Sequence, residues 1–276
     1  MHGNRNKRLV VAVTAALAFC GIPGTAQVLT NSDPVIEAAR ASAAAFARSL
    51  PDYLVKRTTT RYRGLRANRF THDADVKVWQ RIDSVAALVT SRHGTEACAN
   101  IEIDGKPAKS IPPGGSWTVN EFSSVLLGTL TPTSKGRFTN QRQEAILNQA
   151  AFRYDYVIEQ SHSTWQLDAA APHGPGPMHY TTAYGGEIWI GKETGQVLRI
   201  ERLARGVPDD FPLDAIRSIT DYADVKIGEA KYVVPTHSES WFCQRDYREC
   251  LRNDTVFGDY KKFGAETTLT FGEDAK

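Results

Sequence analysis

The sequence predicts an α+β protein that is mainly antiparallel β: one strongly curved sheet with a long N-terminal helix and a short second helix. Three observations predict it. Residues 34–49 carry the one long apolar stripe at helical spacing, and most later segments alternate apolar and polar residues between turns. Helices and strands do not take turns along the chain, which excludes a doubly wound parallel sheet.

The amino-acid composition limits the kinds of partner that the protein can bind. The chain has 276 residues, of which 41% are hydrophobic, enough for a packed core. Its 33 Lys and Arg residues face 31 Asp and Glu residues, a net charge of +2 that is too small for a nucleic-acid-binding protein. No linker or internal repeat divides the chain, so residues 27–276 are expected to form a single domain.

Residues 1–26 have the pattern of a secretory signal peptide. Arg5, Lys7 and Arg8 precede the uncharged run Leu9–Cys20, and small residues end the segment at Ala26. Twelve residues of helix reach about 18 Å, short of a bilayer core of about 30 Å, which disfavours a membrane anchor. A lipoprotein signal at Cys20 is disfavoured by bulky Phe19 beside it.

Cleavage after Ala26 changes the charge balance. It removes three basic residues and leaves 30 against 31 acidic ones. No later segment has the roughly 18 consecutive apolar residues of a spanning helix. The sequence therefore predicts a periplasmic or secreted protein with no transmembrane segment after cleavage.

The helices are predicted from capping and spacing. Asp33 and Pro34 mark a helix start, and Val35, Ala39, Ala43, Phe46 and Leu50 follow at steps of three and four residues. A short helix is expected within 116–130, whereas 141–149 fits either a strand or a helical turn. Strands are predicted at 53–62, 76–79, 83–90, 99–104, 152–160, 163–167, 187–190, 197–200, 223–227, 231–235, 236–242, 251–260 and 266–271, and a Pro- and Gly-rich loop at 169–178.

The cysteines suggest one crosslink. Three of the four cysteines remain after cleavage, and an odd number cannot all pair within one chain. Cys243 and Cys250 flank a predicted hairpin tip, where strand ends lie near bridging distance. A disulfide is favoured, and a zinc site is the alternative, weakened by the absence of a second close Cys pair. Cys98 is expected to be a buried apolar residue.

Catalytic patterns are weak, so the enzyme question stays open and leans towards no enzyme. The chain has seven histidines, and His72, His93, His162, His173, His179 and His237 are scattered along its mature part. No metalloprotease spacing, phosphate-binding loop or Gly-x-Ser-x-Gly sequence occurs. The sequence therefore assigns no catalytic residue, no metal and no cofactor.

Aromatic residues in the predicted strands indicate a binding site. A strongly curved sheet with a helix over it leaves a hollow, and one lined by aromatic and aliphatic side chains binds an apolar ligand. The candidate residues are Trp165, Tyr180, Trp189, Leu198 and Trp241. Plain core packing is the alternative. If Trp189 faces inward, Ile188 and Ile190 face outward, or the reverse.

The hairpin Ile188–Ile200 resembles the periplasmic outer-membrane lipoprotein carrier superfamily. The shared features are a strand with Trp189, a turn ending in Gly195 and a returning strand with Arg199. The later strand Tyr232–Thr236 is similar to the same pattern. The resemblance implies a half-barrel with a helical lid that holds acyl chains or a lipoprotein.

The chain also resembles exported bacterial proteins of unknown function. The matching segments are Leu50–Tyr53, Thr58–Tyr62 and the hairpin that carries Cys243 and Cys250. This branch adds no ligand and no functional residue to the prediction.

Three functions remain as hypotheses. The first is a non-catalytic binding protein that holds a lipid, an acyl chain or another hydrophobic ligand in the concave face of the sheet. The second is an envelope protein-interaction or stress-sensor module, which predicts an exposed apolar patch. The third, a hydrolase, predicts a polar cleft where His and carboxylate or Ser converge.

Overall fold

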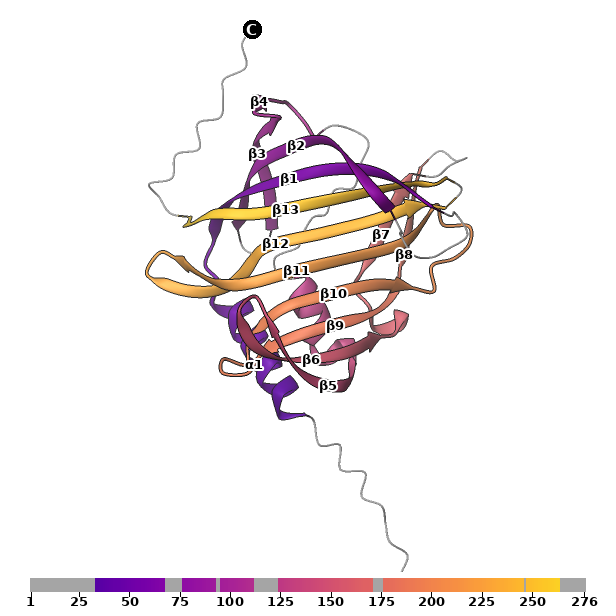
Figure 1. The fold of residues 1–276 in the computed structure, drawn as a ribbon. Helices are drawn as coiled ribbons and strands as arrows, with labels where there is room; N and C mark the ends of the chain where they lie inside the picture. Colours follow the sequence, from indigo (N-terminus) through magenta and orange to yellow (C-terminus); the bar gives the residue numbers. More distant parts are fainter. Residues whose placement is uncertain are drawn as a thin grey trace, which may run out of the picture. The chain divides into compact units, whose positions relative to one another are not determined.

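The computed structural model describes residues 33–67, 76–92, 95–111, 124–170, 176–245 and 247–263, which lie in one compact unit starting at Asp33. The predicted signal peptide, the 266–271 strand and His72, His93 and His173 lie outside these residues. The described chain is mainly antiparallel β, as predicted from the alternating residues (Figure 1).

One sheet of 11 antiparallel strands forms most of the described structure. Its strands are β1 (Tyr53–Arg66), β2 (Val76–Arg92), β3 (Thr95–Ile103), β4 (Lys106–Pro107), β5 (Arg137–Ile146), β6 (Gln149–Ile158), β9 (Ala183–Gly191), β10 (Val197–Arg205), β11 (Leu213–Ile227), β12 (Ala230–Gln244) and β13 (Glu249–Lys262). The order is β4-β3-β2-β1-β13-β12-β11-β10-β9-β6-β5. The sheet is therefore open, with β4 and β5 at its edges.

The strands are longer than the sequence patterns predict. The predicted strands 231–235 and 236–242 are parts of one strand, β12. Asp221 pairs with His237 and Tyr222 with Pro235, so Thr236 is an extra residue in the ladder. Such a bulge accommodates Pro235 without ending the strand. The undecided segment 141–149 lies mostly in β5, passes through the turn at 147–148 and ends at the first residue of β6.

A two-stranded sheet replaces both ends of the predicted Pro- and Gly-rich loop. Its strands are β7 (Gln166–Ala170) and β8 (Pro177–Thr181), so the loop prediction was wrong for Ala169, Ala170, Pro177 and Met178. Pro177 is the first residue of its strand, a position where the missing amide hydrogen is tolerated. The segment 163–165, predicted as strand, follows the short 3-10 helix η2 (Gln160–His162) instead.

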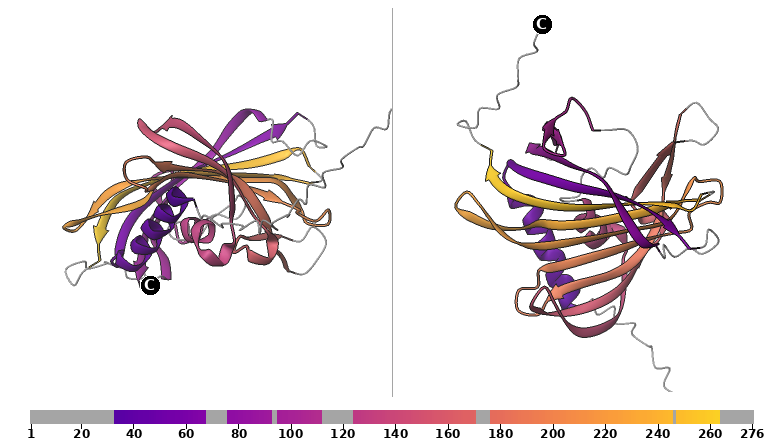
Figure 2. Two further views of the ribbon diagram at one scale, coloured as in Figure 1. Left: turned by 90° about the horizontal axis from the view of Figure 1, so that it is seen from below. Right: turned by 45° about the horizontal axis from the view of Figure 1, so that its top comes forward.

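Two α-helices, α1 (Pro34–Ser49) and α2 (Ser124–Leu130), lie on the concave face of the sheet (Figures 1 and 2). This face is called the helix-side face below, and the convex one the outer face. Asp33 caps α1 by accepting a hydrogen bond from the Val35 amide. The buried residues of α1 are Ile36, Ala39, Ala43 and Phe46, so Ile36 takes the place in the apolar stripe that was predicted for Val35. The 3-10 helix η1 (Pro132–Ser134) follows α2.

The main core lies between the helices and the sheet. Its sheet residues include Val55 of β1, Tyr154 of β6, Ile188 of β9 and Ile200 of β10, all 2% exposed or less. A second cluster joins Leu167 to Phe211 and Ile216, with Trp165 packed against both clusters. No helix of the described residues is long and apolar enough to cross a membrane.

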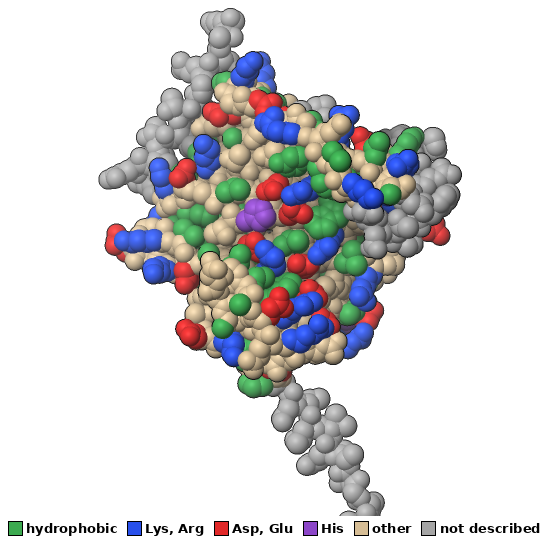
Figure 3. All heavy atoms as spheres, in the orientation of Figure 1, with side chains coloured by type: hydrophobic (Ala, Val, Ile, Leu, Met, Phe, Trp, Pro, Cys, Tyr) green, Lys and Arg blue, Asp and Glu red, His purple; other side chains and the backbone are tan. Residues whose placement is uncertain are grey.

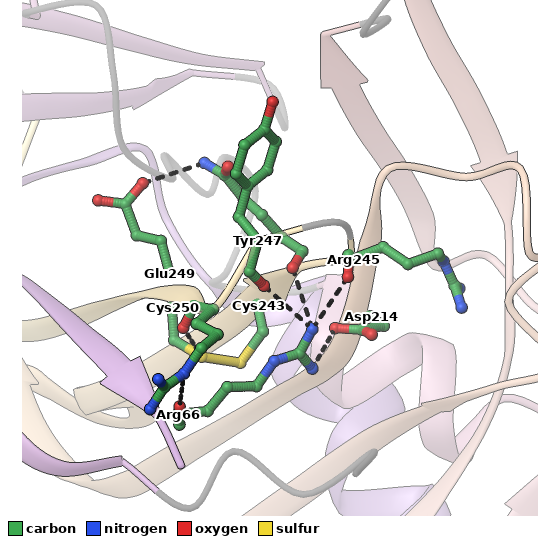
Figure 4. The surroundings of a disulfide bond; sticks show 9 residues. Arg66, Asp214, Cys243, Arg245, Tyr247, Glu249 and Cys250 are labelled. Atoms are coloured by element: carbon green, nitrogen blue, oxygen red, sulfur yellow. Dashed lines mark hydrogen bonds and ion pairs between the residues drawn. A yellow bond between two sulfur atoms is a disulfide. The ribbon is translucent and has the colours of Figure 1, made fainter. Parts of the chain in front are cut away.

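The predicted disulfide is confirmed and the zinc alternative for its two cysteines is excluded. Cys243 and Cys250 are directly paired on β12 and β13, with their sulfur atoms bonded and their Cα atoms 4.0 Å apart (Figure 4). Cys98 on β3 is exposed, so its expected burial was wrong. Partial desolvation by its neighbours still raises the pKa of the Cys98 thiol, against the effect of the Arg57 charge.

Candidate functional site

The structure separates the five predicted ligand-binding residues into two groups. Trp165, directly before β7, and Tyr180 on β8 lie on the helix-side face, where they pack with Phe211 and Ile216. Trp189, Leu198 and Trp241 lie on the outer face, by the alternation of their strands. The five residues therefore do not line one surface, and their binding roles stay predictions.

The orientation of β9 explains where Trp189 lies. Ile188 and Ile190 are buried in the core under the helices, so Trp189 between them faces outward. There it is 4% exposed and packs with Ala151 and Leu198. A register shift between Val197 and Arg199 makes Leu198 an extra residue and places it beside Trp189.

Buried polar side chains cross the helix-side face where apolar ones were predicted. They come from six neighbouring strands and are at most 9% exposed. We call them the polar band: Thr59, Arg61, Asp83, Arg202, Ser218, Thr220, Ser238, Ser240, Asn253 and Thr255.

The strand registers show that these side chains share one face. Ile200, a core residue, pairs with Thr220, and the row continues through Ser238 and Thr255 to Thr59. Residues directly opposite in a ladder point to the same side. The second row lies two residues further along each strand: Arg202, Ser218, Ser240, Asn253, Arg61 and Asp83.

The band has two charged ends with small polar residues between them. At one end, Arg61 donates to both carboxylate oxygens of Asp83, at 2.7 and 2.5 Å. The hydroxyls of Thr59 and Thr255 lie 3.0 Å apart between β1 and β13. A fixed row of donors and acceptors of this kind can orient a polar group of a ligand.

Arg202 forms the other end, close to an aromatic cluster. Its Nε donates to the Ser218 hydroxyl at 3.0 Å, and its guanidinium lies 4.3 Å from the Trp165 ring centroid. Trp165 meets Tyr184 edge to face at 5.5 Å. Burial raises the pKa of the Tyr184 phenol and, more strongly, of Tyr156, while the nearby Arg202 charge opposes both shifts. Both phenols are therefore neutral hydrogen-bonding groups here.

The outer face carries interspersed acidic and basic side chains (Figure 3). At its centre His237 on β12 lies between two carboxylates, 3.4 Å from Asp221 and 3.0 Å from Asp254. Arg199 donates to both oxygens of Asp221. The hydrogen bond to Asp221, then that to Asp254, raises the pKa of His237 against the effect of burial.

The described residues offer little for catalysis. They contain no group of three or more His, Cys, Asp or Glu side chains that could hold a metal ion. His179 pairs with Asp168 on the exposed β7–β8 hairpin, and His237 faces carboxylates and not a Ser hydroxyl. The polar band contains hydroxyls but no His, so a serine-hydrolase arrangement is absent from it.

Sequence reasoning missed the polar band, although a signal for it exists. Four strands carry small polar or charged residues at positions i and i+2: Thr59 and Arg61, Ser218 and Thr220, Ser238 and Ser240, Asn253 and Thr255. Taken alone, each pair reads as the solvent side of a half-buried strand. Only the register shows that the helices lie on that side.

Comparisons with known proteins add little. No family model and no curated protein matches the chain. A solved structure, a DUF1329 family protein from Desulfovibrio piger ATCC 29098, is similar at 12% identity and a TM-score of 0.37, covering 86% of this chain and 96% of that chain. This likeness is too distant to assign a family, so membership of the lipoprotein carrier superfamily stays a prediction.

Proposed function

We propose that this chain is an exported, non-catalytic binding protein that holds an amphipathic ligand, a lipid or an acylated molecule, on the helix-side face of a half-barrel sheet. The observation that carries the proposal is the polar band, which borders the apolar core on the same face. An acyl chain would pack against core residues such as Ile188 and Ile200, and its polar group would meet the band.

The interior chemistry favours a ligand with two kinds of surface. Buried hydroxyl and guanidinium groups are costly without hydrogen-bond partners, so a core that only had to be stable would be apolar. A purely apolar ligand would make no hydrogen bond with the polar band. Because the band is covered in this structure, a ligand reaches it only when that cover opens, and α1 and α2 would be the moving lid.

Export is consistent with two further features. The Cys243–Cys250 disulfide is typical of an oxidising compartment, and no described helix can span a membrane. Cleavage after residue 26 and release into the periplasm or the medium complete the proposal.

Native mass spectrometry of the exported protein tests for the ligand. We expect an amphipathic adduct that organic extraction releases. Protein that carries no adduct under mild conditions, and that also binds no added long-chain fatty acid, would contradict the proposal.

Quenching by a dibrominated fatty acid tests the face. The heavy atoms quench nearby indoles, and Trp165 lies beside the band whereas Trp189 and Trp241 lie on the outer face. Quenching should disappear in Trp165→Phe and persist in the matched controls Trp189→Phe and Trp241→Phe. Loss in the Trp189 variant instead would place the ligand on the outer face.

A protein-interaction module is the second candidate, favoured by exposed apolar residues at one end of the sheet. Leu65 on β1 is 64% exposed and Val78 on the neighbouring β2 is 69% exposed, and Tyr247 at the adjoining β12–β13 tip is 65% exposed. Replacing Leu65 and Val78 by Asn would then abolish capture of an envelope partner without changing fatty-acid binding.

A further inference from the structure

Four arginines of the described residues are buried, and three of them, Arg61, Arg66 and Arg202, differ in the groups that they face. Arg61 bonds Asp83, and Arg66 bonds Asp214 at 2.9 Å. Arg202, 9% exposed, has no carboxylate within ion-pair distance among the described residues. Its nearest acidic neighbour in sequence, Glu201, is turned to the outer face and pairs with Arg217 there.

The surroundings of Arg202 leave its charge without a counterion. Nε is used by the Ser218 hydroxyl, and one face of the guanidinium is covered by Trp165. Neither Nη group donates to another described residue. A hydroxyl and an indole ring stabilise a cation only in part, and a buried charge without an opposite charge is destabilising.

We infer that Arg202 is an anion-binding subsite: its free Nη groups take the carboxylate or phosphate of the amphipathic ligand, with Trp165 fixing the plane of the guanidinium. A planar fork of two N–H groups matches two oxygens of either anion. The hydroxyls of Ser218 and Ser240 stand next along the same row and can donate to the remaining oxygens.

This inference rests on the proposed function and narrows it, because it names the head group. The apolar part of the ligand would extend from Arg202 along β10 towards Ile200, which lies two residues away on the same face. A neutral amphiphile would keep the apolar contacts and lose the ionic one.

Four ligands with one chain length separate these contributions: palmitate, palmitoyl lysophosphatidate, monopalmitoylglycerol and hexadecanol. Wild-type protein should bind the two anions at least about tenfold more tightly than the two neutral molecules, because hydrogen bonds to a charged group are the stronger ones. The ratio between palmitate and lysophosphatidate decides between a carboxylate and a phosphate head.

Arg202→Met removes the charge and keeps much of the side chain's length. It should weaken anion binding about tenfold or more and leave neutral binding within about twofold. Arg205→Met, an exposed arginine on the same strand, is the matched control and should change neither.

Thermal unfolding without ligand is the second readout. Because Arg202 is a buried cation without a carboxylate, Arg202→Met should unfold at the same temperature as wild type or higher. Equal anion binding by Arg202→Met and wild type would overturn the subsite while the binding function stands. A lower unfolding temperature with equal loss of all four ligands would make Arg202 a structural residue. Failure of wild-type protein to bind any of the four would remove both proposals.

Discussion

Arg66 shows how one buried side chain can organise a loop. Its guanidinium bonds Asp214 and the backbone carbonyls of Gln244, Arg245 and Tyr247, all at 2.9 to 3.3 Å (Figure 4). The side chain of Arg248 returns a bond to the Arg66 carbonyl. This single residue of β1 therefore holds the tip between β12 and β13 to the rest of the sheet.

Replacing Arg66 by Met should lower the free energy of unfolding by about 3–5 kcal/mol, because Asp214 and three carbonyls lose a buried partner. Urea denaturation of the two proteins measures the difference. Arg63→Met, an exposed position on the same strand, is the control and should stay within about 0.5 kcal/mol of wild type. A loss of less than about 1 kcal/mol at Arg66 would mean that solvent replaces these contacts.

His237 couples stability to pH. Its pKa is raised above 6.5 in the folded protein, first by the hydrogen bond to Asp221. A raised pKa means that the protonated form stabilises the fold, fully below 6.5, and that this contribution disappears as pH rises through the raised value. Burial opposes ionisation of Asp221, but Arg199 and then His237 lower its pKa, so Asp221 is ionised near neutral pH.

His237→Gln should therefore destabilise the protein most in mildly acidic buffer and least above neutral pH. Unfolding temperatures measured across this range for both proteins give the difference curve. His162→Gln, in the η2 turn, controls for the loss of a titratable ring. A difference that does not change with pH would contradict the ionic role of His237.

Two kinds of contact fix the tip of the β12–β13 hairpin: the hydrogen bonds of Arg66 and the Cys243–Cys250 disulfide. A crosslink over a sequence separation of 7 restricts the unfolded chain, by about 2–3 kcal/mol in the chain-entropy treatment. Cys243→Ser with Cys250→Ser should lower the unfolding temperature by several degrees. Alkylation without reductant should label one cysteine, Cys98, in denatured mature protein, and three after reduction. Labelling of three cysteines before reduction would show that the bridge does not form.

Local patterns predicted some elements well and others poorly. The β9–β10 hairpin was predicted correctly because its alternation and its turn are local, and Gly195 has the positive φ of 66° that the turn requires. The β7–β8 sheet was missed because Pro and Gly within a segment indicate a loop, while its strands are stabilised by distant Phe211 and Ile216. The bulge at Leu198, which moves a predicted site residue to the outer face, has no local signal.

The arrangement of the whole sheet depends on pairings far apart in sequence. Strand β1 pairs with β13, so that Thr59 meets Thr255. Such pairings decide which face of each strand the helices cover, and a single sequence does not contain them. For this reason the curved antiparallel fold could be predicted, whereas the polar band could not.

The two faces of the sheet differ in whether the arginines beside their tryptophans are paired with carboxylates. On the outer face the guanidinium groups of Arg153 and Arg199 lie 5.5 and 6.0 Å from the Trp189 ring centroid, and both are paired with carboxylates. On the helix-side face Trp165 lies against Arg202, which has no such pair. The charge balance around each tryptophan therefore distinguishes the two faces, whereas the presence of a tryptophan does not.

An open sheet must protect its edges, and β5 does so with charge. Arg142 pairs with Asp155, and Glu144 with Arg153, along a strand whose residues are mostly exposed. Charged side chains on an edge strand oppose pairing with a second copy.

Arg142→Val with Glu144→Val should therefore produce association that increases with protein concentration, measured by size-exclusion chromatography with light scattering. Lys226→Val with Glu229→Val removes an equal pair of charges at the β11–β12 turn, away from the edges, and should stay monodisperse with wild type. Equal association of both variants would mean that lost charge in general, and not the exposed edge of β5, governs self-association.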